Sequence, residues 1–308
     1  MAAVSVADLR SVKETELHAL RERLARHLPH SLPVYGSVSL VVRYGLHSLQ
    51  PASILVHATP HSSSLTIIAP VTSGDPQCIQ VFWSIKEHTV QEVAQYLSHI
   101  PHLDWGQPVC IRALPSILLP SLQSLGSIAG KQVQLQTTFQ GHLYSLQVPA
   151  TLGKELPPEY HVTSLRKEDA LLAWTNWEFN KFDLMDNICN DITHFPSFGI
   201  RQCCSKDDGS LLQEEAQGRL VSWVHLCKIG SMGNTFTMPQ HRHRGLASTA
   251  TLALACKLLQ EGLLPYVYIG NYNTASISLH EGLGFKQQCE VHTINLVLAE
   301  VTDQDYRG

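Results

Sequence analysis

The stretch from Thr235 to Ser248 constrains the fold more than any other part of the sequence. An apolar, strand-like run there meets a basic turn that opens a helix. The spacing Arg242-x-x-Gly245-x-Ala247 places small residues where a backbone must approach a ligand closely. The first N–H groups of a helix lack partners within it and favour anions. We therefore predict an anion cradle at this turn. The alternative is an ordinary helix N-terminus whose arginines face solvent.

Three basic residues occupy the turn itself: Arg242, His243 and Arg244. Their charge adds to the partial positive charge of the helix end, and an arginine can bind two phosphate oxygens at once. A pyrophosphate would suit such a site.

The composition indicates a folded chain whose anion site is local. The 308 residues are 44% hydrophobic and 16% charged, enough for the cores of two domains. A net charge of −4 excludes a general attraction to nucleic acid or anionic membranes. No run approaches the ~20 apolar residues of a membrane span, so we expect a soluble protein. Eight cysteines without C-x-x-C spacing suggest reduced, mostly buried thiols.

The N-terminal half reads as alternating helices and strands without a chemical site. It contains no acid pair, nucleophile-base set or glycine cradle, so we predict a scaffold domain or one wall of a substrate pocket. The predicted helices are 6–28, 87–99 and 118–128, and the predicted strands are 34–42, 54–57, 65–69, 80–84, 109–114, 132–138 and 142–148.

A proline-punctuated linker at 149–158 separates this half from the rest, giving predicted domains at 1–150 and 159–308. In the second domain the cradle follows consecutive antiparallel strands and not a βαβ unit, which argues against NAD. The predicted strands are 160–165, 200–204, 220–226, 232–238, 266–269 and 291–298; the predicted helices begin at Arg166, Leu246 and Asn273.

The C-terminal motifs, taken as a set, resemble the GNAT acyltransferase superfamily. They are the strand ending at Met238-Pro239, the turn Arg242-x-x-Gly245-x-Ala247, Asn273-x-x-Ser276, and Leu279-His280-x-x-Leu283-Gly284-Phe285. The resemblance implies an α/β (α+β) chain of two GNAT-like domains, each a mixed, mostly antiparallel sheet flanked by helices, with a degenerate N-terminal one. It also implies an acyl-CoA site in which the turn's amides bind the pyrophosphate and the preceding strand pairs with the pantetheine arm. The residues so implied are Phe236, Met238, Arg242, His243, Arg244, Gly245, Leu246, Ala247, Ser248 and Asn273.

Leu32–Val38 and Gly218–Trp223, with the motif region, are similar to the glycine N-acyltransferase family. That resemblance implies transfer of an acyl group from acyl-CoA, as co-substrate, to the amine of glycine or another small amino acid. It implies no permanently bound cofactor and no metal. It points to mitochondria, whereas the mixed-charge N-terminus alone suggests a cytoplasmic protein.

Two positions depart from the family pattern. Gln240 stands where the family carries a glutamate base and is unable to accept a proton. His225, His241 or ordered water would then take the proton, or turnover is weak. His280 occupies the place of a tyrosine that protonates the leaving thiolate; the alternative is a polar residue that faces solvent or caps nearby backbone. Asn273 serves as a helix N-cap, either alone or beside the pantetheine.

Two other functions remain open at this point. One is a GNAT acetyltransferase for another amine, disfavoured by the lack of a strongly acidic run in the C-terminal half. The other is a CoA-binding protein with weak or lost turnover that acts through partners, which Gln240 suggests.

Overall fold

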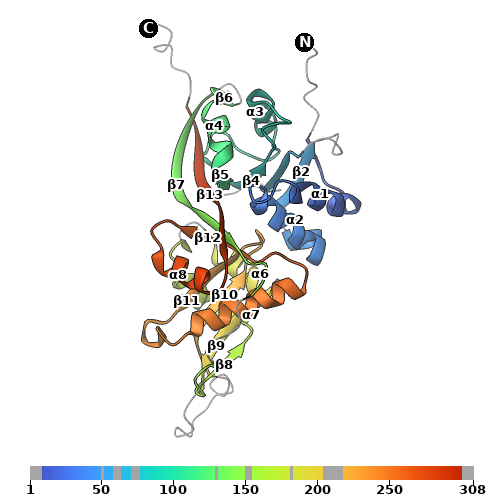
Figure 1. The fold of residues 1–308 in the computed structure, drawn as a ribbon. Coiled ribbons are helices and arrows are strands. Elements are labelled where there is room, and N and C mark those ends of the chain that lie inside the picture. Colours follow the sequence, from blue (N-terminus) through green and yellow to red (C-terminus); the bar gives the residue numbers. More distant parts are fainter. Residues whose placement is uncertain are drawn as a thin grey trace. The chain divides into compact units, whose positions relative to one another are not determined.

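The computed structural model describes residues 9–49, 52–57, 64–70, 77–128, 131–149, 155–180, 183–203 and 218–299. The chain divides into unit 1, residues 1–143 and 288–308, and unit 2, residues 144–287 (Figure 1). The predicted ranges 1–150 and 159–308 differ from these units mainly at the C-terminus, because the last strand pairs with a strand of unit 1. Residues 150–154 of the predicted linker lie outside the described residues.

Unit 1 combines a sheet with short helices. Its elements are β1 (Leu9–Ser11), α1 (Leu17–Ala25), α2 (Leu32–Tyr44), β2 (Ala52–His57), β3 (Thr66–Pro70), β4 (Cys78–Phe82), α3 (Val90–Ser98), β5 (Val109–Pro115), α4 (Leu119–Gln123), β6 (Ser127–Ile128), and most of β7 (Lys131–Ser145) and of β13 (Lys286–Ala299).

The larger sheet has the strand order β1-β2-β3-β4-β5-β13-β7-β12, and β6 pairs with β7. The pairs β1–β2, β2–β3, β3–β4 and β5–β13 are antiparallel, and β4–β5 is parallel. Its last strand, β12 (Tyr266–Gly270), belongs to unit 2. The mixed, mostly antiparallel sheet agrees with the sequence-based prediction.

Helix α2 corrects the predicted strand at 34–42. Pro33 sits in the first helical turn, where its missing N–H costs nothing, and Gly45 ends the helix with φ of 88°. Most residues between are buried, α2 contacts β3 and β4, and the Ser37 hydroxyl donates to Gln80 on β4 at 2.8 Å. Tertiary burial therefore outweighs the strand preference of its valines.

Three other predictions for unit 1 were wrong in extent, and two of them assigned a short strand to a helix. The predicted helix 6–28 contains β1 before α1, and the predicted helix 118–128 is the short α4 followed by β6. The predicted strands 132–138 and 142–148 are one 15-residue strand, β7. The strand Gln132–Thr138 thus continues through Gly141 without a turn.

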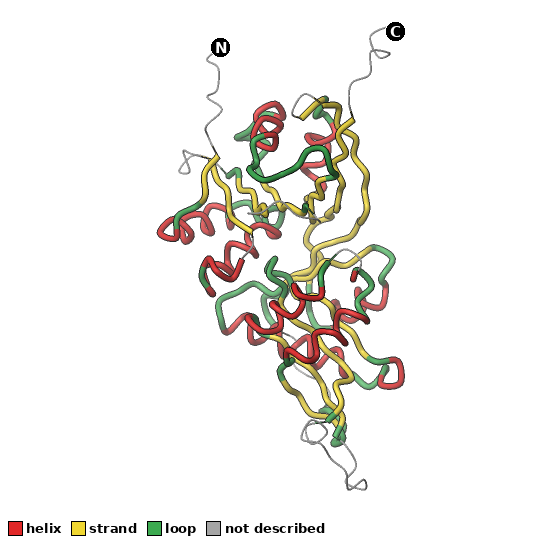
Figure 2. Tube along the Cα trace, turned by 180° about the vertical axis from the view of Figure 1, so that it is seen from behind, coloured by secondary structure: helices red, strands yellow, loops and turns green. Residues whose placement is uncertain are grey.

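Unit 2 carries the predicted cradle. Its further elements are β8 (Tyr160–Thr163), α5 (Ala170–Thr175), α6 (Met185–His194), β9 (Ser197–Gln202), β10 (Arg219–Leu226), β11 (Met232–Thr237), α7 (Leu246–Gln260) and α8 (Thr274–Gly282). An antiparallel sheet has the order β11-β10-β9-β8. Helix α7 packs on β9, β10 and β11. Figure 2 shows the helices of unit 2 lying against its strands.

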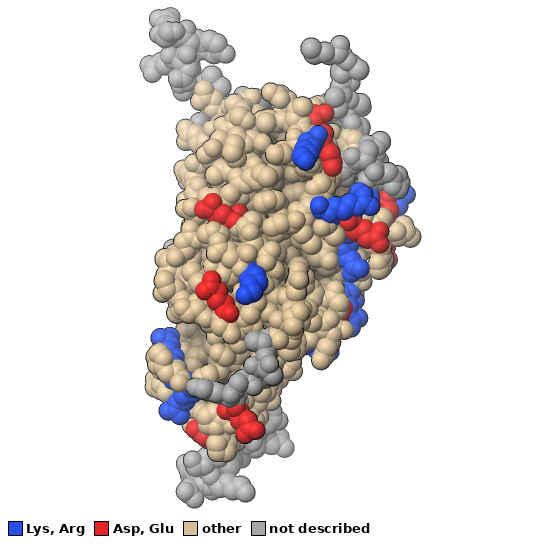
Figure 3. All heavy atoms as spheres, viewed as in Figure 1, with Lys and Arg blue, Asp and Glu red and all other residues tan. Residues whose placement is uncertain are grey.

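The structure can be compared with the expectations drawn from composition for surface charge, membrane spans and cysteines. On the described part of the face in Figure 3, basic and acidic side chains are interspersed and form no continuous basic area. The described helices include none with the length and apolar character of a bilayer span. The seven described cysteines form no disulfide with one another; six are partly buried and Cys203 is exposed.

Candidate functional site

Strand β11 presents an edge that no strand covers among the described residues. It ends the four-stranded sheet, while its neighbour β12 ends the larger sheet, and the two approach each other without forming a ladder. An extended chain could pair with the backbone of such an edge. Ligand pairing along β11 stays a prediction of the resemblance, and the strand edge that it requires is uncovered among the described residues.

The turn after β11 exposes the start of α7. Gly245 has φ of 77°, a left-handed conformation that glycine adopts without strain, and an added Cβ would meet nothing within 4 Å. The amides of Gly245, Leu246, Ala247 and Ser248 donate to no acceptor among the described residues. Leu246 anchors the helix by burial, whereas Ala247 and Ser248 are partly exposed. Four amide donors thus converge where an anion can enter.

The three basic residues of the turn are exposed, and the two arginines donate hydrogen bonds to neighbouring residues. The Arg242 guanidinium donates to the Thr237 carbonyl at 3.1 Å and lies over the Phe236 ring. His243 is exposed with φ of 62°. Phe236 itself stacks on Trp223, and Met238 packs on the same apolar cluster. The Met238 amide donates to the Val221 carbonyl and the Phe236 carbonyl accepts from the Ser222 hydroxyl, so these backbone groups face β10 and not the uncovered edge.

Arg244 belongs to a network that the sequence did not reveal. It donates to the Tyr160 hydroxyl at 3.0 Å and lies 3.6 Å from the Glu159 carboxylate. The same hydroxyl lies 2.9 Å from Nδ1 of His241. Tyr160 starts β8 and is 81 residues from His241, so no local pattern could have linked them.

His241 is the partly exposed candidate base. It ends the short 3₁₀ turn Pro239–His241, beside the exposed Gln240. Burial, and then the charges of Arg244 and Arg219, lowers its pKa below the ordinary 6.5. The imidazole is therefore neutral at physiological pH, as a base must be.

His225 lies elsewhere on the sheet. Strand pairing places it opposite Gly233 at the start of β11, whereas His241 follows the end of that strand. Four residue steps separate Gly233 from Thr237 and span about 13 Å, so the two histidines lie too far apart to act on the same amine. His225 is 0% exposed, and burial lowers its pKa to about 4.

His280 and Asn273 lie on α8. Asn273 accepts the Ser276 amide at 3.1 Å, which confirms its N-cap role. Nδ1 of His280 lies 2.8 Å from the Ser276 carbonyl and therefore carries the proton. His280 is 2% exposed, so it does not face solvent, and burial lowers its pKa. Its contact with the Ser276 carbonyl agrees with the alternative of a residue that bonds to nearby backbone. In this neutral tautomer Nε2 holds a lone pair and no proton for a leaving thiolate.

Comparison with known proteins indicates the class of protein to which this site geometry corresponds. Residues 211–294 match the family model described as FR47-like protein. Glycine N-acyltransferase of Rattus norvegicus is 23% identical over 276 residues, covering 84% of this chain and 88% of that protein.

Two solved structures share the fold over nearly the whole chain. A Drosophila protein from a structural genomics consortium has a TM-score of 0.72 at 17% identity, covering 94% of this chain and 98% of its own. A tandem GNAT protein from the clavulanic acid biosynthesis pathway has a TM-score of 0.56 at 14% identity, covering 96% and 99%.

The two-unit fold is thus that of the GNAT proteins, and the comparisons support a transferase of the GNAT type. Within that class, the chain resembles glycine N-acyltransferase over most of its length.

Proposed function

We propose that the protein transfers an acyl group from acyl-CoA to the amine of glycine or another small amino acid. The observation that carries the proposal is the set of four unpartnered amides at the start of α7, directly after the uncovered edge of β11. The pyrophosphate would bind these amides, and the pantetheine arm would extend along β11. The similarity to rat glycine N-acyltransferase supports the choice of a small amino acid as acceptor.

His241 is the base in this proposal. In the competent tautomer, Nδ1 donates to the Tyr160 oxygen, which also accepts from Arg244, and Nε2 carries the free lone pair. Nε2 takes the amine proton as nitrogen attacks the thioester carbon. The C–S bond then breaks, the amide forms, and the CoA thiolate leaves and gains a proton. His225 and His280 are enclosed and neutral, so they would need a structural change to reach the amine.

Thiol release measures the reaction directly. Benzoyl-, acetyl- and long-chain acyl-CoA are each incubated with single amino acids and with spermine, and the N-acyl product is identified by mass. Release that requires glycine or another small amino acid supports the proposal. Release without acceptor dependence contradicts it, and release with spermine alone indicates an acetyltransferase for another amine.

The exposed Gln240 favours one alternative, a CoA-binding protein with weak turnover. CoA binding in calorimetry without thiol release in any reaction would support that alternative. Absence of CoA binding would refute the cradle itself.

A further inference from the structure

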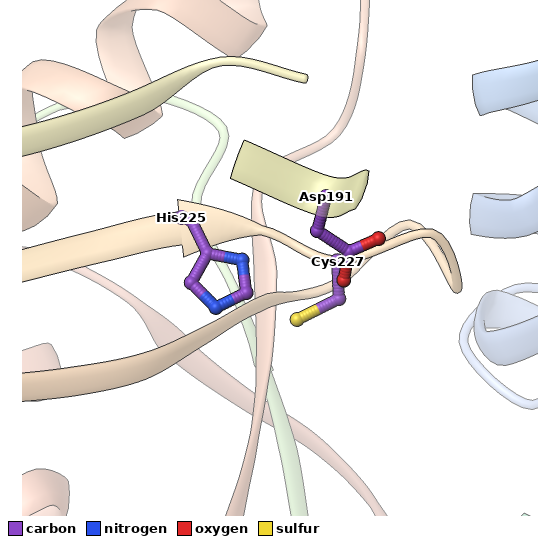
Figure 4. A group of neighbouring side chains, drawn as sticks. All are labelled: Asp191, His225 and Cys227. Atoms are coloured by element: carbon purple, nitrogen blue, oxygen red, sulfur yellow. The ribbon is translucent and has the colours of Figure 1, made fainter. Parts of the chain in front are cut away.

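Asp191, His225 and Cys227 form a compact polar group at one end of the unit 2 sheet. One ligand atom from each lies within 4.8 Å of the others. Figure 4 shows the thiol of Cys227 pointing toward the imidazole of His225, with the carboxylate of Asp191 beside Cys227. Asp191 comes from α6, His225 from β10, and Cys227 from the turn that leads to β11. Three segments thus bring a sulfur, a nitrogen and an oxygen donor together.

The His225 ring has one nitrogen without a hydrogen-bond partner in the described part of the chain. Its Nδ1 lies 3.4 Å from the Leu226 carbonyl, which can only accept a hydrogen bond, so the proton resides on Nδ1. Nε2 then keeps a lone pair, is fully buried, and has no hydrogen-bond partner among the described residues. A backbone carbonyl on one ring nitrogen and a free lone pair on the other is the arrangement of metal-binding histidines.

The surroundings fix the other two donors. The Lys228 amide donates to Oδ1 of Asp191 at 3.1 Å, and the Lys228 ammonium bonds to Asn187 at 2.8 Å. Asp191 is 4% exposed, whereas Cys227 is partly exposed and gives a path for entry. A Cβ added to Gly233 would stand 2.9 Å from Sγ of Cys227, so glycine there leaves room for the thiol.

We propose that Asp191, His225 and Cys227 bind one Zn²⁺ ion, with water in the fourth position. Thiolate, imidazole and carboxylate are all zinc ligands, and a tetrahedral site with metal–ligand distances of 2.0–2.3 Å separates ligand atoms by about 3.3–3.8 Å. The group therefore contracts by about 1 Å on binding. Carboxylate and thiolate together balance the charge of the ion.

The ion would join α6 to the β10–β11 turn and would stiffen the start of β11. Acyl transfer itself needs no metal, so this inference stands apart from the proposed function.

Cobalt binding tests the site on the full-length, tag-free protein. Co²⁺ is titrated into protein stripped of metal, and the thiolate-to-cobalt charge-transfer band reports coordination by cysteine. We expect one equivalent of Co²⁺ with this band, displacement by Zn²⁺, and a Zn²⁺-dependent rise in Tm. Cys227→Ser should abolish the band and weaken Zn²⁺ binding at least about 100-fold.

Asp191→Asn, which is nearly isosteric, should weaken binding without removing the thiol. Cys256→Ser, at a partly buried cysteine on α7, is the matched control and should bind like the unaltered protein. Circular dichroism verifies that each variant is folded. Absence of the charge-transfer band in the unaltered protein, or one equivalent of Zn²⁺ retained by both the Cys227 and Asp191 variants, would overturn the proposal.

Discussion

Replacing Gly245 by alanine separates the role of the cradle from the stability of its helix. Gly245 has φ of 77°, and alanine in that conformation costs about 1–2 kcal/mol. The added methyl clashes with nothing in the free protein and instead projects into open space beside the exposed amides. If it denies a phosphate one charge-assisted hydrogen bond, worth about 1.5–3 kcal/mol, the Kd for CoA rises about 10- to 150-fold.

The same helix supplies the control. Gly262, just beyond its C-terminus, has φ of 73° and also has open space around an added Cβ. Gly262→Ala should therefore lose similar stability in urea unfolding and keep its affinity for CoA. Calorimetry with CoA and with acyl-pantetheine, which lacks the pyrophosphate, completes the test. Equal loss of CoA affinity in both variants, or equal loss for both ligands in Gly245→Ala, would refute the cradle.

Three further predictions follow from the site and the core. Gln240→Glu should raise kcat up to about 100-fold by restoring a carboxylate base. Gln260→Glu, at another exposed position, is the control and should leave kcat unchanged. Steady-state thiol release measures both variants. The pKa of His241 is lowered, and a base acts when it is deprotonated, so kcat should stay constant down to pH 6.5 and decrease only below it. A decrease of kcat centred above pH 6.5 in the pH–rate profile would count against His241 as the base. The Arg201 side chain is 6% exposed and pairs with Asp169 at 2.6 Å. Asp169→Asn would leave this buried charge without its partner and should destabilise the protein by about 3 kcal/mol in urea unfolding. A loss below about 1 kcal/mol would contradict this prediction.

The sequence predicted best where a segment carries its own signals. Helix α7 combines a long apolar run with a glycine before and after it, and α8 has an asparagine N-cap that the structure confirms. Strands β10 and β11 were predicted within two residues of their observed ends. These features depend on residues that lie next to one another in the chain.

It failed where distant segments decide the structure. The valines of α2 favour a strand in isolation, and burial against α1, β3 and β4 makes the segment helical. The last strand was assigned to the C-terminal domain, yet it pairs with β5 of unit 1. No local periodicity records either contact.

The same distinction applies to the candidate site. The turn at Arg242–Ala247 was found from spacing, but its contact with Tyr160 was not, since the two are about 80 residues apart in the chain. Likewise, nothing in the sequence joined Asp191 to His225 and Cys227. The enclosure of His225 and His280 also emerged only from packing.

Hydrogen–deuterium exchange with and without CoA tests the central claim most directly. The amides of Gly245, Leu246, Ala247 and Ser248 have no partner in the free protein and should exchange rapidly. Saturating CoA should slow exchange in peptides that span 239–252, and pantetheine alone should not. Unchanged exchange in these peptides, with CoA bound by calorimetry, would show that the nucleotide binds elsewhere and would contradict the account.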